Sequence, residues 1–143
     1  MMTRDDFLVY MSHFNNKNYD GLVTYFTDDV KVRYFTDMKR GAPRGNVLHG
    51  PAEFVESYRH LHDTVDEKLE LGKFVCDEDN LYVELWTEFW FKEDTPDFSA
   101  GPMKKGDVFV CTNFVLYYFD ENGKFKEIHI AHHRVHDPAE ARL

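Results

Sequence analysis

Two long strand-like segments joined by a tight turn constrain the fold of this chain more than any other feature. In residues 108–119 both alternating series of side chains are largely apolar, which is typical of a strand covered by protein on both faces. Asn122-Gly123 favours a tight turn because it accepts positive φ at little steric cost. The return strand spans residues 125–135, and one of its faces is predicted to carry Ile128, Ile130, His132 and Arg134. We therefore expect a strand pair that needs helices on one side and a second subunit on the other.

Length and composition indicate a single globular domain spanning residues 1–143. The chain is 43% hydrophobic and 16% aromatic, which is too apolar for a disordered protein, and it is long enough to bury a core. The net charge of −9 argues against a nucleic-acid partner, because phosphate binding needs clustered Lys and Arg. No apolar run approaches the roughly 18 residues of a membrane span, and the first residues lack an apolar signal region. We therefore expect no membrane partner and a cytoplasmic location.

The first half of the chain predicts three helical segments. Thr3 can cap the first helix, whose apolar stripe follows at i, i+3, i+4 and i+7 as Phe7, Tyr10, Met11 and Phe14. A short second helix is expected over residues 19–26, before a strand over residues 30–35. Pro51 favours the first turn of a third helix, whose apolar stripe contains Phe54, Val55, Tyr58, Leu61 and His62. Residues 36–46 are predicted to form a mobile loop beside a cavity.

Helical segments followed by four long strands predict an α+β fold. Further strands are expected near residues 67–76 and over residues 81–92. We predict a strongly curved antiparallel sheet with about three helices packed on its concave face. Such a cone leaves a pocket between helices and sheet in which a small ligand can bind.

The strand expected over residues 81–92 has two different faces. One face suits a core and contains Leu81, Val83, Leu85, Thr87 and Phe89. The other mixes large amphipathic aromatic residues with charge, which is typical of a subunit interface, and contains Tyr82, Glu84, Trp86, Glu88 and Trp90. We predict a homodimer through Tyr82, Trp86 and Trp90. In the alternative interpretation, a loop over residues 93–105 covers part of this face.

Residues 14–30 read FNNKNYDGLVTYFTDDV and resemble the L-N-x-G-D-x-D-G-I-x-x-L-F-x-D-D-A run of the nuclear-transport-factor-2-like superfamily. Gly50-Pro51-Ala52-Glu53-Phe54 and Asn122-Gly123-Lys124-Phe125 match its later G-x-x-x-I and x-G-K-I signposts. Within this superfamily the chain is similar to the branch of ketosteroid isomerases and SnoaL-type polyketide cyclases. The resemblance implies the cone fold, a cavity for an apolar substrate and chemistry without a cofactor.

Carried over by position, the resemblance implies that Tyr10 donates a hydrogen bond to a developing enolate oxygen and that Tyr58 is hydrogen-bonded to Tyr10. A phenol in an apolar cleft stabilises an oxyanion better than water does, because it needs no reorganisation. The general-base aspartate of ketosteroid isomerases is replaced here by Tyr34, and their second oxyanion donor falls near Val115. These departures leave steroid-type proton transfer without its base.

Cys111-Thr112-Asn113 resembles the Ser-x-Asn stretch of scytalone dehydratase, another member of the superfamily. In that enzyme the serine and asparagine orient a hydroxylated ring substrate, while histidines and tyrosines handle protons. The resemblance implies that Asn113 orients a ligand through its amide, which both donates and accepts hydrogen bonds. Cys111 in place of serine is a departure from the pattern.

Histidines are the candidate proton carriers, because an imidazole titrates near neutral pH. His132 shares the predicted cavity face with Ile128 and Ile130, so it is the first candidate for a general base, and His62 is the second. For both, a structural or solvent-exposed role is the alternative. His49 is expected at a pocket mouth, and the remaining expected ligand contacts are Tyr34, Phe54, Leu85, Ile128 and Ile130. No two histidines lie four residues apart on a predicted helix, so we predict no metal site, and no cofactor.

Two functions follow from these observations. The first is a cofactor-independent isomerase, dehydratase or cyclase that acts on an apolar, oxygenated polyketide- or terpenoid-like molecule by acid/base catalysis. The second is a non-catalytic module of the same fold that binds a small ligand or forms a dimer. Polar groups that converge inside the cavity favour the enzyme, whereas a filled aromatic core favours the module.

Overall fold

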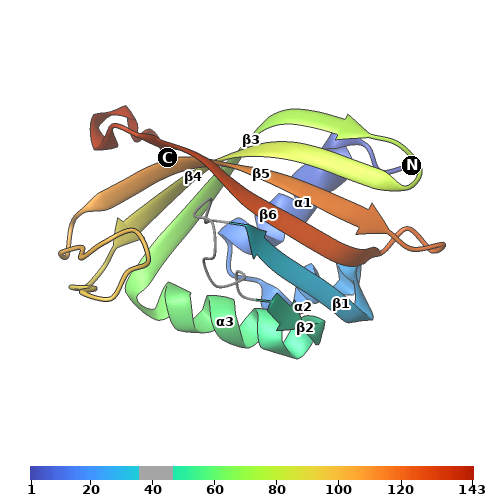
Figure 1. The fold of residues 1–143 in the computed structure, drawn as a ribbon, viewed down its shortest axis with the longest axis horizontal. Coiled ribbons are helices and arrows are strands. Elements are labelled where there is room, and N and C mark those ends of the chain that lie inside the picture. The colour runs from blue at the N-terminus through green and yellow to red at the C-terminus, as the bar shows by residue number, and fades with distance from the viewer. Residues whose placement is uncertain (36–46) are drawn as a thin grey trace, which may run out of the picture.

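The computed structural model describes residues 1–35 and 47–143 (Figure 1). Its helices are α1 (Arg4–Asn15), α2 (Tyr19–Leu22) and α3 (Gly50–Thr64), with short 3-10 turns η1 (Val23–Tyr25) and η2 (Pro138–Glu140). Its strands are β1 (Phe26–Phe35), β2 (Val47–His49), β3 (Val65–Cys76), β4 (Asn80–Phe91), β5 (Val108–Phe119) and β6 (Phe125–His136). The loop predicted over residues 36–46 lies outside the described residues. Within the described part of the chain, no helix has the length and apolar character needed to cross a membrane.

The strands form one curved sheet in the order β2-β1-β6-β5-β4-β3, and the helices pack on its concave side (Figure 1). The predicted α+β cone is therefore confirmed. Neighbouring strands are antiparallel except β1 and β6, which run parallel, so the expectation of a purely antiparallel sheet is corrected at this pair. β1 comes first in the chain and β6 last, so no hairpin links them and antiparallel pairing is not imposed.

The second helical segment is shorter than predicted, and the first strand begins earlier. α2 and η1 together end at Tyr25, and β1 already begins at Phe26 rather than at Val30. Phe26 is buried and pairs with Phe125 of β6. The start of β1 is therefore set by a contact with a residue near the other end of the chain. The sequence pattern around Phe26 does not reveal this contact.

Helix α1 forms where the sequence predicts it and buries the predicted stripe. The Thr3 side chain accepts a hydrogen bond from the backbone N–H of Asp6, and the Asp6 side chain accepts one from the backbone N–H of Thr3. This capping box satisfies N–H groups that the first turn of a helix leaves without partners. The buried residues of the helix are Phe7, Tyr10, Met11 and Phe14.

The outer edge of β3 is closed by side chains from α1 and the residues just after it. Asn15 donates its amide N–H to the carbonyl of Leu69 and accepts the N–H of Leu69, both at 2.9 Å, as a neighbouring strand would. Arg4 donates to the carbonyls of Leu71 at 3.3 Å and Gly72 at 2.9 Å. An open strand edge invites pairing with other chains, and these contacts remove that opportunity while fixing α1 across the concave face.

One extra residue in β6 interrupts its alternation. Asn113 pairs with His132, whereas the preceding Thr112 pairs with Arg134. Such a bulge moves every later side chain of the strand to the opposite face. Arg134 therefore shares the convex face with its partner Thr112, and the prediction that it lies on the same face as Ile128 is wrong.

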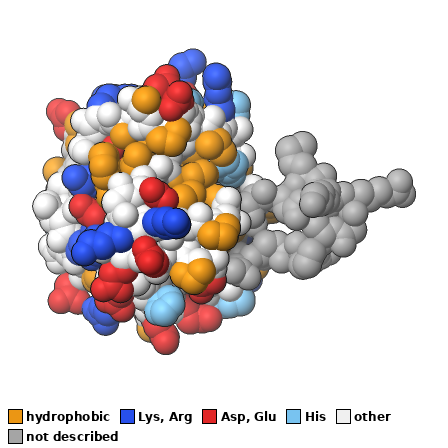
Figure 2. All heavy atoms as spheres, turned by 90° about the vertical axis from the view of Figure 1, so that its left-hand side faces the viewer, with side chains coloured by type: hydrophobic (Ala, Val, Ile, Leu, Met, Phe, Trp, Pro, Cys, Tyr) orange, Lys and Arg blue, Asp and Glu red, His pale blue; other side chains and the backbone are white. Residues whose placement is uncertain are grey.

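The loop between β4 and β5 folds onto the end of the sheet. Its Phe98 packs against Phe89, Phe91 and Phe109, with ring centres 4.8 to 5.6 Å apart. These partners belong to the alternating series that faces inward, so Phe98 does not cover the series that contains Trp86. Viewed from this end, the surface shows hydrophobic side chains in groups among acidic and basic ones (Figure 2).

Residues 137–143 fold back across the convex face, and we call them the strap. Beneath the strap the side chain of Glu88 is fully buried. Its carboxylate accepts the backbone N–H of Arg142 at 2.8 Å and that of Leu143 at 3.1 Å. The strap is therefore held by one buried acid of β4.

The same carboxylate also organises the two tryptophans of β4. The indole N–H of Trp86 donates to Glu88 at 2.8 Å and that of Trp90 at 3.0 Å. Arg142 places its guanidinium 3.9 Å from the ring centre of Trp86 and bonds Glu70 at 2.6 Å. The strap thus occupies part of the face that the sequence predicts to be a dimer interface.

We predict that Glu88→Gln destabilises the fold at neutral pH. Burial alone would raise the pKa of Glu88, but its N–H donors together outweigh burial and lower the pKa. A carboxyl whose pKa falls on folding stabilises the fold above its unfolded pKa and loses that contribution as the pH drops through the lowered value. We expect Glu88→Gln to reduce the free energy of unfolding at pH 7 by about 1–3 kcal/mol. This difference should shrink at about pH 3, as measured by urea denaturation at both pH values.

Glu84→Gln is the matched control, because Glu84 lies on the same face of β4 and is outside the cluster around Glu88. We expect it to change stability by less than about 0.5 kcal/mol, as is usual for surface substitutions. Equal losses of stability in the two variants, or a Glu88→Gln effect that does not depend on pH, would contradict the role of Glu88 in holding the strap.

Candidate functional site

A cavity of about 60 Å³ lies between α1, α3 and the concave face of the sheet. Most of its lining is apolar and comes from Phe7, Met11, Phe14, Phe54, Leu69, Leu85, Val115, Ile128 and Ile130. Its polar lining residues are Tyr10, Tyr58, Glu67, Thr87, Asn113 and Tyr117. The cavity is therefore an apolar space into which a few polar groups converge, which is the usual composition of a small-molecule site.

Glu67 is the one charged residue among the side chains that line this cavity. It follows Val65 and precedes Leu69 and Leu71 in the alternating series of β3 that faces the core, and it is only 6% exposed. A carboxylate is rarely buried without a function or a partner. Sequence reasoning missed Glu67, although a lone acid in an otherwise apolar alternating series was the signal that could have revealed it.

His62 is the partner of Glu67. Helix α3 ends at Thr64 and β3 begins at the next residue, so the corner between them brings the last turn of the helix next to the start of the strand. The Nε2 atom of His62 lies 3.0 Å from Oε1 of Glu67, and its Nδ1 lies 2.6 Å from the hydroxyl of Tyr19. His62 is 7% exposed. We call this arrangement the Glu67–His62–Tyr19 chain.

Phenols also line the cavity, from Tyr10, Tyr58 and Tyr117. Burial raises the pKa of Tyr10 and of Tyr58 well above the usual value, and it also raises the pKa of Tyr117. The hydroxyl of Tyr58 lies 2.7 Å from that of Tyr34, rather than pairing with Tyr10 as the resemblance implies. All four groups are neutral at physiological pH, so a phenol O–H is available as a hydrogen-bond donor inside the cavity.

Asn113 also lines the cavity, and Cys111 lies beside it on β5. The Asn113 amide is 3.3 Å from the hydroxyl of Thr87 and 3.7 Å from Sγ of Cys111. Burial raises the pKa of Cys111 to about 12, so its sulfur remains a neutral thiol and not a nucleophilic thiolate. Asn113 thus supplies the amide that the sequence predicts to face a ligand.

The structure brings together most of the predicted site and separates two histidines from it. The predicted residues that line the cavity are Tyr10, Tyr58, Asn113, Phe54, Leu85, Ile128 and Ile130. His62 contacts Glu67 and Tyr34 contacts Tyr58, but neither is among the described residues that line the cavity.

His132 and His49 are not among the described residues that line the cavity. His132 pairs with Asn113 across the sheet, but its side chain is exposed. Partial desolvation of its ring, followed by the charge of His133, lowers its pKa. His49 is exposed at the start of α3, where its ring lies 3.8 Å from Glu53. Neither imidazole is placed to exchange a proton with a ligand in the cavity.

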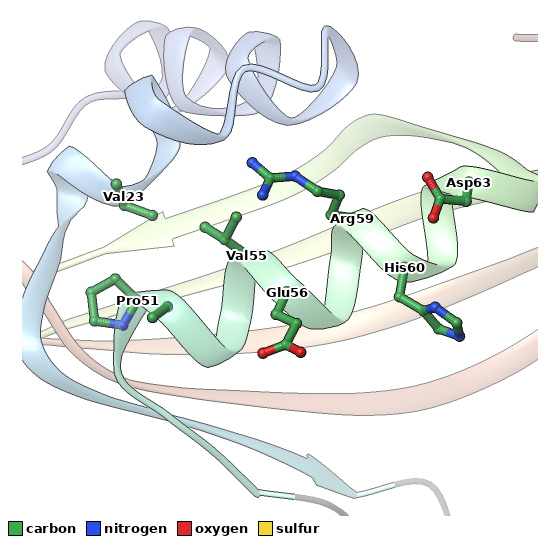
Figure 3. Close-up of a pocket in the computed structure, with 8 residues that line it drawn as sticks. Val23, Pro51, Val55, Glu56, Arg59, His60 and Asp63 are labelled. Atoms are coloured by element: carbon green, nitrogen blue, oxygen red, sulfur yellow. The ribbon is translucent and has the colours of Figure 1, made fainter.

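A second hollow, of about 680 Å³, runs along the outer side of α3 and is open to solvent (Figure 3). Figure 3 shows acidic and basic side chains spread along it, from Glu56 to Arg59, His60 and Asp63. These charges do not converge on one point, which distinguishes this groove from the cavity. In residues 1–35 and 47–143, no group of three or more His, Cys, Asp or Glu side chains is arranged to hold a metal ion.

A family model described as a SnoaL-like domain matches residues 8–128. The chain belongs to the SnoaL-like family. A search of curated proteins finds no match to it.

Solved structures agree with this membership of the SnoaL-like family. A SnoaL-like polyketide cyclase from Agrobacterium tumefaciens matches with a TM-score of 0.68 at 19% identity, covering 94% of each chain. An NTF2-like protein of unknown function from Burkholderia pseudomallei matches with a TM-score of 0.64 at 15% identity, covering 92% of this chain and 87% of that one. A hypothetical protein with a ketosteroid isomerase-like fold from Catenulispora acidiphila, in complex with trimethylamine, matches with a TM-score of 0.67 at 11% identity. That match covers 90% of this chain and 85% of the other. At these identities the matches establish the fold.

We predict that the two histidine candidates differ sharply in their contribution to stability. His62→Ala leaves the buried carboxylate of Glu67 without its donor, which should reduce the free energy of unfolding by about 1–3 kcal/mol. His132→Ala removes an exposed ring and should change it by less than about 0.5 kcal/mol. Urea denaturation of both variants tests the site assignment, and a larger loss for His132→Ala would overturn it.

Proposed function

We propose that this SnoaL-like protein is an isomerase or cyclase that works by acid/base catalysis in the cone cavity, with Glu67 as the general base. The observation that carries the proposal is a buried carboxylate that lines the same mostly apolar cavity as three phenols. The sequence-based candidates for the base, His132 and His62, give way to Glu67 because it is the titratable base that lines the cavity. Convergent polar groups of this kind support an enzyme over a structural module.

The proposed reaction begins at a carbon next to a carbonyl group. Glu67 takes a proton from that carbon, the electrons of the broken C–H bond move to the carbonyl oxygen, and an enolate forms. The phenol of Tyr10 or Tyr58 donates a hydrogen bond to this oxygen, and such donors are most effective where water is excluded. Glu67 then returns its proton to a different carbon, which completes an isomerisation. In a cyclisation the enolate carbon instead attacks the carbon of a second carbonyl group in the same molecule, the π electrons of that carbonyl move to its oxygen, and the resulting alkoxide takes the proton from Glu67.

The size of the cavity bears on the substrate. Sites for drug-sized ligands usually measure roughly 300–1,000 Å³. The cavity here measures about 60 Å³, so a fused-ring substrate requires its lining side chains to move. A compact cyclic ketone requires the least movement, and we propose that the reactive portion of the substrate is of this kind.

We predict that Glu67→Gln abolishes most of the activity toward a small β,γ-unsaturated ketone. The probe is cyclopent-3-enone, whose isomerisation to the conjugated cyclopent-2-enone is followed by ultraviolet absorbance. Loss of a general base should lower kcat/KM by roughly 10²–10⁴-fold. Tyr10→Phe removes one oxyanion donor and should lower kcat by up to roughly 10²-fold. Glu84→Gln, on the outer face of β4, should keep the wild-type rate. Wild-type protein without activity above buffer, or Glu67→Gln with full activity, contradicts the proposed function.

We further propose a homodimer through the part of the convex face that lies beside the strap. Tyr82 and Phe114 are half-buried there with ring centres 5.7 Å apart, and such aromatic residues are enriched in interfaces. We predict that Tyr82→Glu dissociates the dimer, because an unpaired charge would be buried at its centre. Sedimentation velocity measures the mass directly. A wild-type monomer, or a Tyr82→Glu variant of unchanged mass, would rule out this interface.

A further inference from the structure

We propose that Tyr19 is a positioning residue that locks His62 with its Nε2–H toward Glu67, so that the proton removed from the substrate stays on Glu67 and returns to the substrate. The proposal rests on the proposed function of Glu67. It concerns the fate of the proton, which the identity of the base alone does not decide. Neither outcome, return to the substrate or loss to water, is specified by the fold.

The geometry of the Glu67–His62–Tyr19 chain assigns the hydrogen atoms. A carboxylate only accepts hydrogen bonds, so the 3.0 Å contact with Oε1 requires a hydrogen on Nε2 of His62. In the neutral imidazole Nδ1 then carries a lone pair, and it accepts the hydroxyl hydrogen of Tyr19 at 2.6 Å. Both ring nitrogens are therefore committed to partners.

The surroundings of Tyr19 keep its hydroxyl able to donate. Tyr19 begins α2 and is half-exposed, with its ring nearly parallel to that of His62 at 6.0 Å between centres. The guanidinium of Arg59 lies 5.4 Å from the Tyr19 ring. Burial raises the pKa of Tyr19 more than Arg59 lowers it, and Glu67 and Asp63 raise it further. The phenol therefore stays protonated at neutral pH.

Because both ring nitrogens of His62 are hydrogen-bonded, one route by which Glu67 could lose the substrate proton is blocked. When Glu67 takes the substrate proton on its second oxygen, the C–H bond breaks and an O–H bond forms, while Oε1 continues to accept from Nε2–H. For that proton to leave through His62, Nε2 would need a lone pair directed at Glu67. It has none in the neutral form fixed by Tyr19, and it has none if His62 is protonated on both nitrogens. With the route through His62 closed, return of the proton from Glu67 to the enolate carbon is favoured.

Tyr19→Phe removes the lock and leaves the base in place. The Nδ1 atom of His62 then loses its donor. While Glu67 carries the substrate proton, its neutral carboxyl no longer requires a hydrogen on Nε2, and water can move the ring proton from one nitrogen to the other. With Nε2 bare, the imidazole can accept the proton from Glu67 and pass it to water. His62→Gln is the matched conservative variant, because an amide N–H can still donate to Glu67 but offers no ring nitrogen for proton transfer.

Nitrogen-15 NMR of the histidine rings tests the lock without any substrate. We expect the His62 signals of the wild type to show a protonated Nε2 and a hydrogen-bonded Nδ1. Tyr19→Phe should shift the Nδ1 resonance and keep the hydrogen on Nε2, because the carboxylate of Glu67 still requires it, whereas Tyr82→Phe, on the convex face, should change neither resonance. A wild-type His62 with hydrogen on Nδ1 and a bare Nε2, or a spectrum unaffected by Tyr19→Phe, overturns the proposal.

Isomerisation of cyclopent-3-enone in D₂O tests the consequence. We expect the wild type to transfer mainly protium to the new position, and Tyr19→Phe to incorporate several-fold more deuterium per turnover. His62→Gln should retain protium like the wild type. Extensive deuterium in the wild-type product would contradict the proposal that Tyr19 fixes the tautomer of His62 and so retains the substrate proton. A wild type that does not turn over the probe contradicts the function of Glu67 instead, and the NMR result then decides the lock separately.

Discussion

The closure of the β3 edge by α1 is the constraint on which the rest of the structure depends. A curved sheet with an apolar concave face needs something to fill it, and β3 is the strand where the sheet ends. Asn15 and Arg4 bond the free edge of β3 through its own backbone groups, so α1 cannot slide along the sheet. Its apolar stripe is thereby held over the middle of the concave face. The Lys17 ammonium also bonds the backbone carbonyl of Glu67, so the contacts that close the edge also position the acid of the cavity.

Two buried carboxylates on neighbouring strands show how partner number separates a structural role from a chemical one. A carboxylate has about four acceptor positions. Glu88 receives four N–H groups, from two indoles and two backbone amides, so its acceptor capacity is used and its charge is compensated. Glu67 receives one hydrogen bond within the described residues, from His62. The acid on the convex face therefore holds chain segments together, whereas the acid on the concave face has acceptor positions left over, as its proposed role as a base requires.

Local patterns in the sequence predict much of this structure, and contacts between distant residues account for what they miss. The i, i+3, i+4 stripe of α1, its cap at Thr3 and the alternation of β4 all depend on neighbours in the chain, and the structure confirms them. The side of Arg134 depends on a bulge opposite Thr112, which no local pattern marks. Tyr19 lies in the run that carries the family resemblance, yet its role depends on His62, 43 residues away. The resemblance identified the phenols of the cavity, but the base proposed for this chain, Glu67, lies on a different strand from Tyr34, which replaces the aspartate of ketosteroid isomerases.

The proposed pairing of a carboxylate base with neutral donors also limits the chemistry that the cavity favours. Buried phenols with raised pKa values remain uncharged, so they stabilise an oxyanion by hydrogen bonding and do not neutralise it. Glu67 becomes neutral as the enolate forms, so the total charge of the cavity is the same before and after proton transfer. A reaction that moves a negative charge across a small apolar space avoids the penalty of creating a new buried charge. Enolisation satisfies that condition. Hydrolysis by a free hydroxide does not, because it would place a second anion beside Glu67.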